Sequence, residues 1–270
     1  HDAGEGDWFA RKAGAIQVYY EWLPIRQPDN NDDERIWRKF SYGDLLDLYM
    51  LDTRLYGRDE QGSGNAGTRD MLGQAQMDWL LDEMGSSTAL WQMVGQQVMM
   101  SPSIVNTDDA WSGYPATRDT LLAFVDANVD NFVVLTGDVH TSWSTDIPKD
   151  GYSDANKSES YGVEFVVTSV TSASIPISIP ISLVQSIYPA VQYVNTNEKG
   201  YMVVNITKDR AQADYYYVDR IDQPSDVENH EESWYMDETE TWLSEATGPL
   251  VRPQPQPALA PWTVKQTSVN

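Results

Sequence analysis

The sequence has no cysteine, so neither a disulfide bond nor a thiolate metal ligand can form within it. It has only three histidines. His1 is terminal and His230 lies in an acidic segment, so His140 is the one imidazole in the interior of the chain. Among side chains that bind metals, this leaves mainly carboxylates and a single well-placed histidine.

Basic residues are also scarce: 18 Lys and Arg stand against 41 Asp and Glu, giving a formal net charge of -23. Proteins that bind nucleic acids need a basic footprint, and docking on anionic membranes needs basic clusters. The composition therefore argues against both classes of partner. An acidic surface is soluble and self-repelling, and it suits a salty or cation-rich setting. Composition alone does not decide between acidity for solubility and acidity for calcium binding.

A long uninterrupted hydrophobic run is missing as well. The most apolar stretch, residues 173–191, is broken by Pro176, Pro180 and Pro189 and by several serines, which makes it a poor transmembrane segment. The chain starts at His1 and shows no signal peptide, so we expect a processed or partial sequence. Aromatic residues, by contrast, are abundant. The 10 Trp and 15 Tyr indicate large buried side chains and an aromatic-lined cleft.

Strand-like and helix-like spacings of apolar residues alternate along the first half of the chain. Buried strands are predicted within 44–57, 89–103 and 131–143, and amphipathic helices over 72–85 and 115–128. This order of strand, helix, strand, helix, strand predicts an α/β fold in which helices pack on a mainly parallel or mixed sheet.

Further elements flank this alternating core. A helix is predicted over 7–23, with Asp7 as its cap and with Phe9, Ala13, Ile16, Tyr20 and Leu23 on one face. Another strand is predicted at 161–170 and a hairpin at 200–219. Residues from 221 onward are acidic and then Pro-rich, which predicts an extended tail of polyproline type.

Polar side chains follow each of the three predicted strands of the alternating core. They are Asp52–Arg54, then Gln96 and Gln97, then Gly137–His140. Ligands of α/β sheets collect at the carboxyl ends of strands, because the loops converge there. Simpler interpretations stay open at this point: a structural ion pair between Asp52 and Arg54, and glutamines that cap a loop.

The segment "GDVH" presents a carboxylate and an imidazole on either side of one valine. On an extended backbone, Asp138 and His140 would face the same side and reach one metal or a pair of metals. Gly137 permits a sharp exit from the strand. Carboxylate with imidazole suits Fe, Mn or Zn. The alternative is an ordinary turn with a hydrogen-bonded histidine, and two ligands do not complete a catalytic metal site.

Several segments together resemble the PhoD-like alkaline phosphatase family, within the calcineurin-like metallophosphoesterases. They occur in the family's order and cover roughly residues 5–218: "EGDWFARKAGAIQVYYEWLPIR", "FSYGDLLDLYMLDTRLYGRD", "LGQAQMDWLLDEM", "WQMVGQQVMMSP", "VVLTGDVHTSW", "EFVVTSVTS" and "GYMVVNITKDR". The string "LTGDVHTSW" together with an upstream "LDTR" is the specific signal.

The resemblance implies a metallophosphoesterase-like four-layer sandwich, in which two mixed sheets are flanked by helices and a metal cluster lies between the sheet edges. It implies hydrolysis of a small-molecule phosphoester, a monoester or a diester, by a metal-activated water. The implied metals are calcium with iron, or alternatively zinc, manganese or magnesium. The implied location is extracytoplasmic, periplasmic or secreted. The oligomeric state stays open.

The resemblance also assigns roles. The superfamily's last metal motif is Gly-His-x-His, and here Asp138 replaces its first histidine. Asp138 and His140 are therefore expected to bind metal, with His140 alternatively protonating the leaving oxygen. Arg54 is expected to face the phosphate. Gln96 or Gln97, at the next strand end, and Asp52 are expected near the metals.

The chain departs from the family at its start. The family's early metal motifs belong before the helix at Asp7, and this chain has none of them. We therefore expect the C-terminal portion of a longer enzyme, with residues 1–220 as a partial catalytic domain and 221–270 as an extension. The competing class is a non-catalytic acidic module that binds calcium, carbohydrate or a protein partner. A phosphodiesterase or phospholipase on the same scaffold is a third interpretation.

Overall fold

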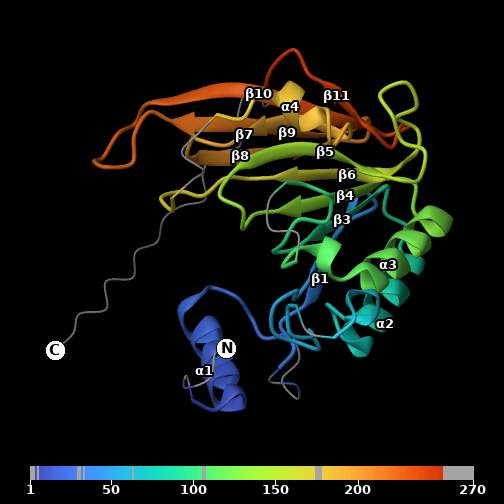
Figure 1. Cartoon of the computed structure of the whole chain (residues 1–270), viewed down its shortest axis with the longest axis vertical. Coiled ribbons are helices and arrows are strands. Elements are labelled where there is room, and N and C mark those ends of the chain that lie inside the picture. Colours follow the sequence, from blue (N-terminus) through green and yellow to red (C-terminus); the bar gives the residue numbers. More distant parts are fainter. Residues whose placement is uncertain are drawn as a thin grey trace.

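The structure, a computed structural model, describes residues 4, 6–28, 32, 34–62, 64–104, 108–173 and 178–251 (Figure 1). The Pro-rich tail predicted for the end of the chain lies outside these residues from position 252 onward. Among the described residues, none of the helices combines the length and the apolar character that crossing a bilayer requires.

A seven-stranded mixed sheet forms the centre of the fold. The strand order is β1-β2-β3-β4-β6-β5-β7. Strands β2, β3, β4 and β6 are parallel, whereas β1 and β5 run antiparallel to their neighbours. The bounds are β1 (Arg38–Tyr42), β2 (Leu46–Met50), β3 (Trp91–Gly95), β4 (Phe132–Thr136), β5 (Ser142–Pro148), β6 (Ser160–Val166) and β7 (Val191–Asn195). All five residues of β3 are buried, as expected for a strand covered on both faces.

Two helices cover one face of this sheet, α2 (Gln74–Gly85) and α3 (Pro115–Asn128) (Figure 1). Each connects two neighbouring parallel strands, so the predicted alternation of strands and helices is confirmed. Leu80 of α2 and Leu121 of α3 share a buried apolar cluster with Val94 of β3 and Val134 of β4. The apolar residues at helical spacing in α2 and α3 thus lie on the sides of these helices that face the sheet.

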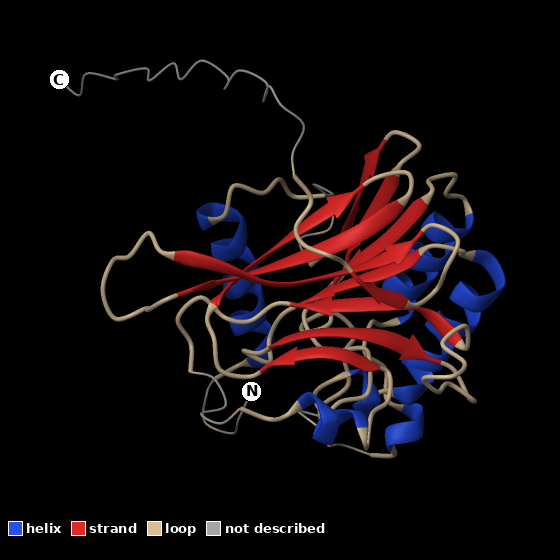
Figure 2. Ribbon diagram, turned by 90° about the horizontal axis from the view of Figure 1, so that it is seen from above, coloured by secondary structure: helices blue, strands red, loops and turns tan. Residues whose placement is uncertain are grey.

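A four-stranded antiparallel sheet covers the opposite face of the larger sheet (Figure 2). Its strand order is β11-β10-β9-β8. Its strands are β8 (Gly200–Ile206), β9 (Arg210–Val218), β10 (Glu228–Asp237) and β11 (Leu243–Glu245). A second apolar cluster joins the two sheets, with Trp91 and Phe165 on one side and Tyr215 and Met236 on the other. The indole nitrogen of Trp91 also donates a hydrogen bond of 2.7 Å to the Thr207 carbonyl, in the turn of the predicted hairpin.

The architecture is therefore an α/β sandwich of two sheets flanked by helices, as the sequence predicts. The larger sheet is mixed, and the smaller one is entirely antiparallel. Residues 228–245, expected to belong to an acidic extension, form two strands of the smaller sheet and bring Met236 and Leu243 into its core. Short helices lie in the connections: α4 (Ile181–Gln185), η1 (Ala66–Thr68) and η2 (Trp111–Gly113).

The first helix, α1 (Trp8–Trp22), begins where the sequence predicts. The Asp7 side chain caps it by accepting a hydrogen bond of 2.8 Å from the Ala10 amide. Ile16 is the buried apolar residue of its predicted face. On that face, Phe9 is 72% exposed, and Leu23, just after the helix, is 47% exposed. The apolar face is therefore present but largely uncovered in the described part of the chain.

Candidate active site at the carboxyl edge of the larger sheet

The parallel strands β2, β3, β4 and β6 end at one edge of the larger sheet, here called the carboxyl edge. The chain leaves β4 at Gly137 and enters β5 at Ser142. Because β6 lies between β4 and β5 in the sheet, residues 137–141 must cross the end of β6. This crossing places the Gly137–His140 motif over the strand edge where the sequence predicts a ligand site.

Asp138 and His140 both have left-handed backbone conformations, with φ angles of 72° and 57°. The expectation that they lie on an extended backbone is therefore wrong. Among the described residues, these two are the non-glycine residues with positive φ. Such conformations cost of order 1–3 kcal/mol each and cluster at functional sites. Asparagine, aspartate and histidine tolerate them better than other side chains do, which explains the residue types found here.

The valine between them turns inward. Val139 packs against a buried cluster that includes Trp143 and Val166, and its amide donates a hydrogen bond of 2.9 Å to the Gly137 carbonyl. Asp138 and His140 are both exposed. The motif thus anchors itself through its apolar residue and presents its carboxylate and its imidazole to solvent.

The imidazole of His140 is oriented by the connection after β6. Its Nδ1 lies 2.8 Å from the Ala173 carbonyl oxygen, which only accepts hydrogen bonds, so Nδ1 carries the proton. In the neutral ring, the lone pair is then on Nε2, the atom that ligates a metal or accepts a proton. The Thr168 hydroxyl lies 2.9 Å from both the His140 and the Glu198 carbonyl oxygens, which ties the motif to the connection after β7.

A buried polar network lies beneath the motif. The Thr136 hydroxyl donates to Glu164 Oε1 at 2.6 Å and accepts from Gln96 Nε2 at 2.7 Å. The Glu164 carboxylate also accepts the amides of Met100 and Ser101, at 2.9 and 2.7 Å. Burial raises the pKa of Glu164, although its hydrogen bonds oppose the shift. Glu164 therefore joins the ends of β3, β4 and β6.

Gln96 and Gln97, predicted near the metals, are both held by protein groups. Gln96 is buried, and its Oε1 accepts from the Val98 amide and from the Trp111 indole. Gln97 Oε1 accepts the Thr53 amide at 2.8 Å, and its Nε2 donates to the Leu51 carbonyl at 2.9 Å. The two glutamines thus fix the ends of β3, β4 and β2 relative to one another.

Asp52, also predicted near the metals, is buried and caps the turn that follows β2. Its carboxylate accepts the amides of Arg54, Leu55 and Tyr56 at 2.8 to 3.0 Å. The three backbone amides occupy both carboxylate oxygens, so the structure gives Asp52 a role in capping this turn.

Arg54 reaches from this turn to Asp109. Its Nη1 lies 2.8 Å from both carboxylate oxygens of Asp109, and Arg58 pairs with the same carboxylate. The Arg54 side chain is 45% exposed, whereas that of Arg58 is 8% exposed. Of the two guanidinium groups, that of Arg54 is therefore the one accessible to solvent and to dissolved anions.

Two hollows flank this edge. One, of about 440 Å³, lies beside Arg54 and Gln97 and has an aromatic and aliphatic lining that includes Tyr19, Phe40 and Leu55. The other, of about 590 Å³, includes Ala173, the residue that holds His140, and is lined by Asn197, Lys199 and Arg220. Burial lowers the pKa of Lys199. The first hollow is thus mainly apolar, whereas the second has a mixed lining that includes two basic side chains.

The residues present match a metal site in donor type but not in donor number. Asp138 and His140 offer an exposed carboxylate and an exposed imidazole, which are donors that Fe, Zn and Mn accept. Among the described residues, no group of three or more His, Cys, Asp or Glu is placed to hold a metal ion. A catalytic zinc site takes about three protein ligands, and a two-metal site takes more.

The sequence indicates Asp138, His140, Arg54, Asp52 and the two glutamines at this edge, but not two buried residues of the network beneath it, Glu164 and Thr136. Glu164 lies inside an apolar strand, and Thr136 is the last residue of β4. A single acid in the otherwise apolar "GVEFVV" was the available signal, since a buried carboxylate must be hydrogen-bonded.

The sandwich and its edge site define an α/β protein whose polar loops converge at the ends of parallel strands. Comparison with known proteins gives the family: residues 1–215 match the PhoD-like phosphatases. The chain belongs to the PhoD-like phosphatase family.

Individual relatives agree with this assignment. Alkaline phosphatase D of Bacillus subtilis (strain 168) is 32% identical over 264 residues, which cover 90% of this chain and 45% of that protein. A solved structure titled "Structure of PhoD" superposes with a TM-score of 0.77 at 30% identity, covering 93% of this chain and 52% of that one. The chain thus spans about half the length of these relatives.

Proposed function

We propose that this chain forms part of a phosphatase that hydrolyses phosphoesters with the help of bound metals. Asp138 and His140 are its proposed metal ligands. The supporting observation is the Gly137–His140 motif itself, in which two left-handed residues present a carboxylate and an imidazole at the carboxyl edge. Membership of the PhoD-like phosphatase family supports the reaction type.

Each group at the edge has a proposed task. Asp138 supplies a carboxylate oxygen to metal, and His140 supplies Nε2, because Ala173 holds the opposite ring nitrogen. Arg54 faces the substrate phosphate when it exchanges part of its contact with Asp109 for phosphoryl oxygens. The metals would supply positive charge and lower the pKa of the attacking water. Calcium with iron is the proposed set, with zinc, manganese or magnesium as alternatives.

The remaining ligands are proposed to come from the part of the enzyme that the relatives have and that their match to this chain does not cover. Two observations support this: the described residues offer too few clustered donors, and the relatives are about twice as long. The 270-residue chain alone is expected to hydrolyse no generic phosphomonoester when calcium and iron are supplied. Robust hydrolysis by the purified chain would contradict the need for further ligands.

The central test replaces Asp138 by asparagine in a complete enzyme. Asparagine tolerates the left-handed backbone and keeps the size of the side chain, so the change mainly removes the charge. We expect nearly complete loss of turnover together with reduced metal content. Asp150→Asn, at an exposed turn, is the matched control and should leave both unchanged. Full turnover and full metal content in Asp138→Asn would overturn the assignment.

The same preparations separate the other interpretations. A non-catalytic acidic module would take up calcium without transition metal and without any turnover. Comparing a phosphomonoester with a phosphodiester identifies which bond the enzyme prefers. The proposed extracytoplasmic location rests on the family, and fractionation of the source cells tests it.

A further inference from the structure

A polar cavity of about 450 Å³ lies at the opposite edge of the larger sheet, far along the strands from the Gly137–His140 motif. Its lining includes Leu90 and Asn131, which precede β3 and β4, and Ser160, the first residue of β6. The turn between β10 and β11, residues 238–241, closes it from the smaller sheet. This cavity shares no lining residue with the candidate active site.

The cavity is acidic. Four carboxylates and one ammonium group line it, those of Asp126, Asp130, Glu238, Glu240 and Lys149. Lys149 pairs with Asp126 and lies 5.1 Å from the centre of the Tyr161 ring. In the described part of the chain, no basic side chain forms a salt bridge with Asp130, Glu238 or Glu240.

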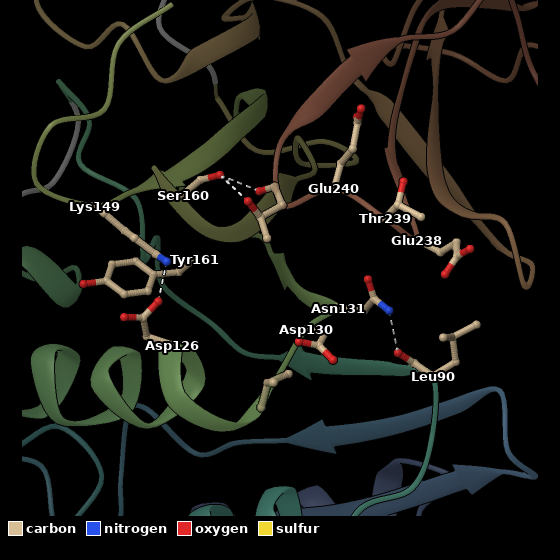
Figure 3. A pocket seen from close by; sticks show the side chains of 12 residues that line it. Leu90, Asp126, Asp130, Asn131, Lys149, Ser160, Tyr161, Glu238, Thr239 and Glu240 are labelled. Carbon is tan, nitrogen blue, oxygen red and sulfur yellow. Dashed lines mark hydrogen bonds and ion pairs between the residues drawn. The ribbon is translucent and has the colours of Figure 1, made fainter. Parts of the chain in front are cut away.

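A buried amide provides an independent sign of a ligand. Asn131 is 5% exposed, and its Oδ1 is shielded from solvent without a hydrogen-bond partner. Its Nδ2 donates to the Leu90 carbonyl at 3.1 Å, which fixes the orientation of the amide. Figure 3 shows the amide oxygen directed away from Leu90, toward the space below Glu240. A buried acceptor without a donor costs free energy, and a donor seated in the cavity would remove that cost.

The acidic turn is held in place before any ligand arrives. The Ser160 hydroxyl donates to the Thr241 carbonyl at 2.7 Å, and the Glu238 amide donates to the Asp209 carbonyl at 2.8 Å. Burial, followed by the nearby charge of Asp237, raises the pKa of Glu240. A cation beside Glu240 would relieve this unfavourable charge.

We propose that this cavity binds a small organic cation, a polyamine or similar ammonium compound, whose N–H groups meet Asn131 Oδ1 and the carboxylates of Asp130, Glu238 and Glu240. An organic cation fits better than a metal ion for two reasons. Among the described residues no three carboxylates converge on one point, and the volume exceeds what a bare ion fills. The cavity already accommodates one ammonium in this manner, that of Lys149, between a carboxylate and an aromatic ring.

The test uses spermidine, titrated into the full chain by calorimetry at low ionic strength, where charge interactions are least screened. We expect saturable binding of one spermidine per chain. The double variant Asp130→Asn, Glu240→Gln should bind it about tenfold more weakly. The control double variant Asp226→Asn, Glu231→Gln makes the same change in net charge at exposed positions and should stay within about twofold of the original affinity.

A third variant, Asn131→Leu, removes the buried acceptor without changing charge and should also weaken binding, with folding checked by circular dichroism. Equal weakening in the two double variants would show attraction to the whole acidic surface and would overturn the proposal. Complete displacement of spermidine by an equal concentration of calcium would overturn it in favour of a metal site. None of these readouts depends on phosphatase activity.

Discussion

The hydroxyl of Thr136 donates a hydrogen bond of 2.6 Å to Oε1 of Glu164, so the residue just before Gly137 is tied to a fully buried carboxylate. Glu164 in turn holds two amides of the segment after β3. The exposed side chains of Asp138 and His140 therefore lie above a buried polar network, and its contribution to stability can be measured.

Thr136→Val keeps the shape of the side chain and removes the hydroxyl. Glu164 then loses a donor and Gln96 loses an acceptor, both inside the protein. We expect a loss of about 1–3 kcal/mol in the free energy of unfolding, measured with urea. Thr120→Val, on the exposed side of α3, is the control and should cost clearly less. Equal costs would mean that the network contributes nothing beyond an ordinary surface bond.

Asp138→Gly and Asp138→Ala should differ in stability. Glycine adopts a φ of 72° freely, whereas alanine is strained there by roughly 1–2 kcal/mol. We expect the glycine variant to be the more stable of the two by about 1 kcal/mol in thermal or urea unfolding, and both to lack activity in the complete enzyme.

The same pair of changes at Asp150 is the control for that experiment. Asp150 is exposed and has no positive φ. Its alanine variant should be the more stable one, because glycine increases the entropy of the unfolded chain. The same order at both positions would contradict the left-handed conformation of Asp138.

Asp146 should make stability depend on pH. Burial raises the pKa of this carboxyl group to about 7, although hydrogen bonds from Tyr152 and the Leu243 amide oppose the shift. A folded-state pKa above the ordinary value of 3.8 means that the folded protein binds the proton more tightly. The resulting stabilisation is complete below pH 3.8 and is lost as the pH rises toward about 7.

Asp146→Asn removes this titration. Unfolding free energies measured between pH 4 and pH 7, at intervals of about half a unit, should fall less steeply with pH in the variant than in the original protein. Asp226→Asn, at an exposed position, should leave the slope unchanged. An unchanged slope in Asp146→Asn would show that folding does not shift the pKa of the Asp146 carboxyl group.

Arg54 and Arg58 share Asp109 but should differ in their contribution to stability. The Arg58 side chain is 8% exposed and lies 4.5 Å from the centre of the Tyr114 ring, whereas that of Arg54 is 45% exposed. We expect Arg58→Gln to cost roughly 2–4 kcal/mol and Arg54→Gln less than about 1 kcal/mol in urea unfolding. Similar costs would show that burial does not distinguish the two guanidinium groups.

Helices and strands can be predicted from the sequence where their buried apolar residues recur at regular helical or strand spacing. The cap at Asp7, the helices α2 and α3, and the hairpin of β8 and β9 were all predicted. The strand β5 was not, because its buried positions hold polar residues. The Ser144 hydroxyl is hydrogen-bonded to Tyr215, and the Asp146 carboxylate accepts from Tyr152 and from the Leu243 amide. The tyrosine that pairs with Ser144 lies far along the chain, and no local window reveals it.

The candidate site also has features that the sequence predicts and features that it does not. Convergence of the three strand ends follows from the alternation of strands and helices, and therefore from sequence. The left-handed backbone of Asp138 and His140 does not, since it depends on Val139 reaching its cluster and on the contact with Ala173. The sequence left open that Gln96 and Gln97 cap a loop and that Asp52 pairs with Arg54. The structure shows instead that the glutamines connect strand ends, that Asp52 caps its own turn, and that Arg54 pairs with Asp109.

The crossing of residues 137–141 over the end of β6 has a consequence for how this segment can vary. Neighbouring strands lie about 4.8 Å apart, so the crossing spans roughly 10 Å between β4 and β5. The five residues 137–141 cover that span while Val139 is fastened midway. The sheet order therefore fixes the length of the motif: an inserted or deleted residue between β4 and β5 would move the His140 imidazole away from the Ala173 carbonyl that orients it.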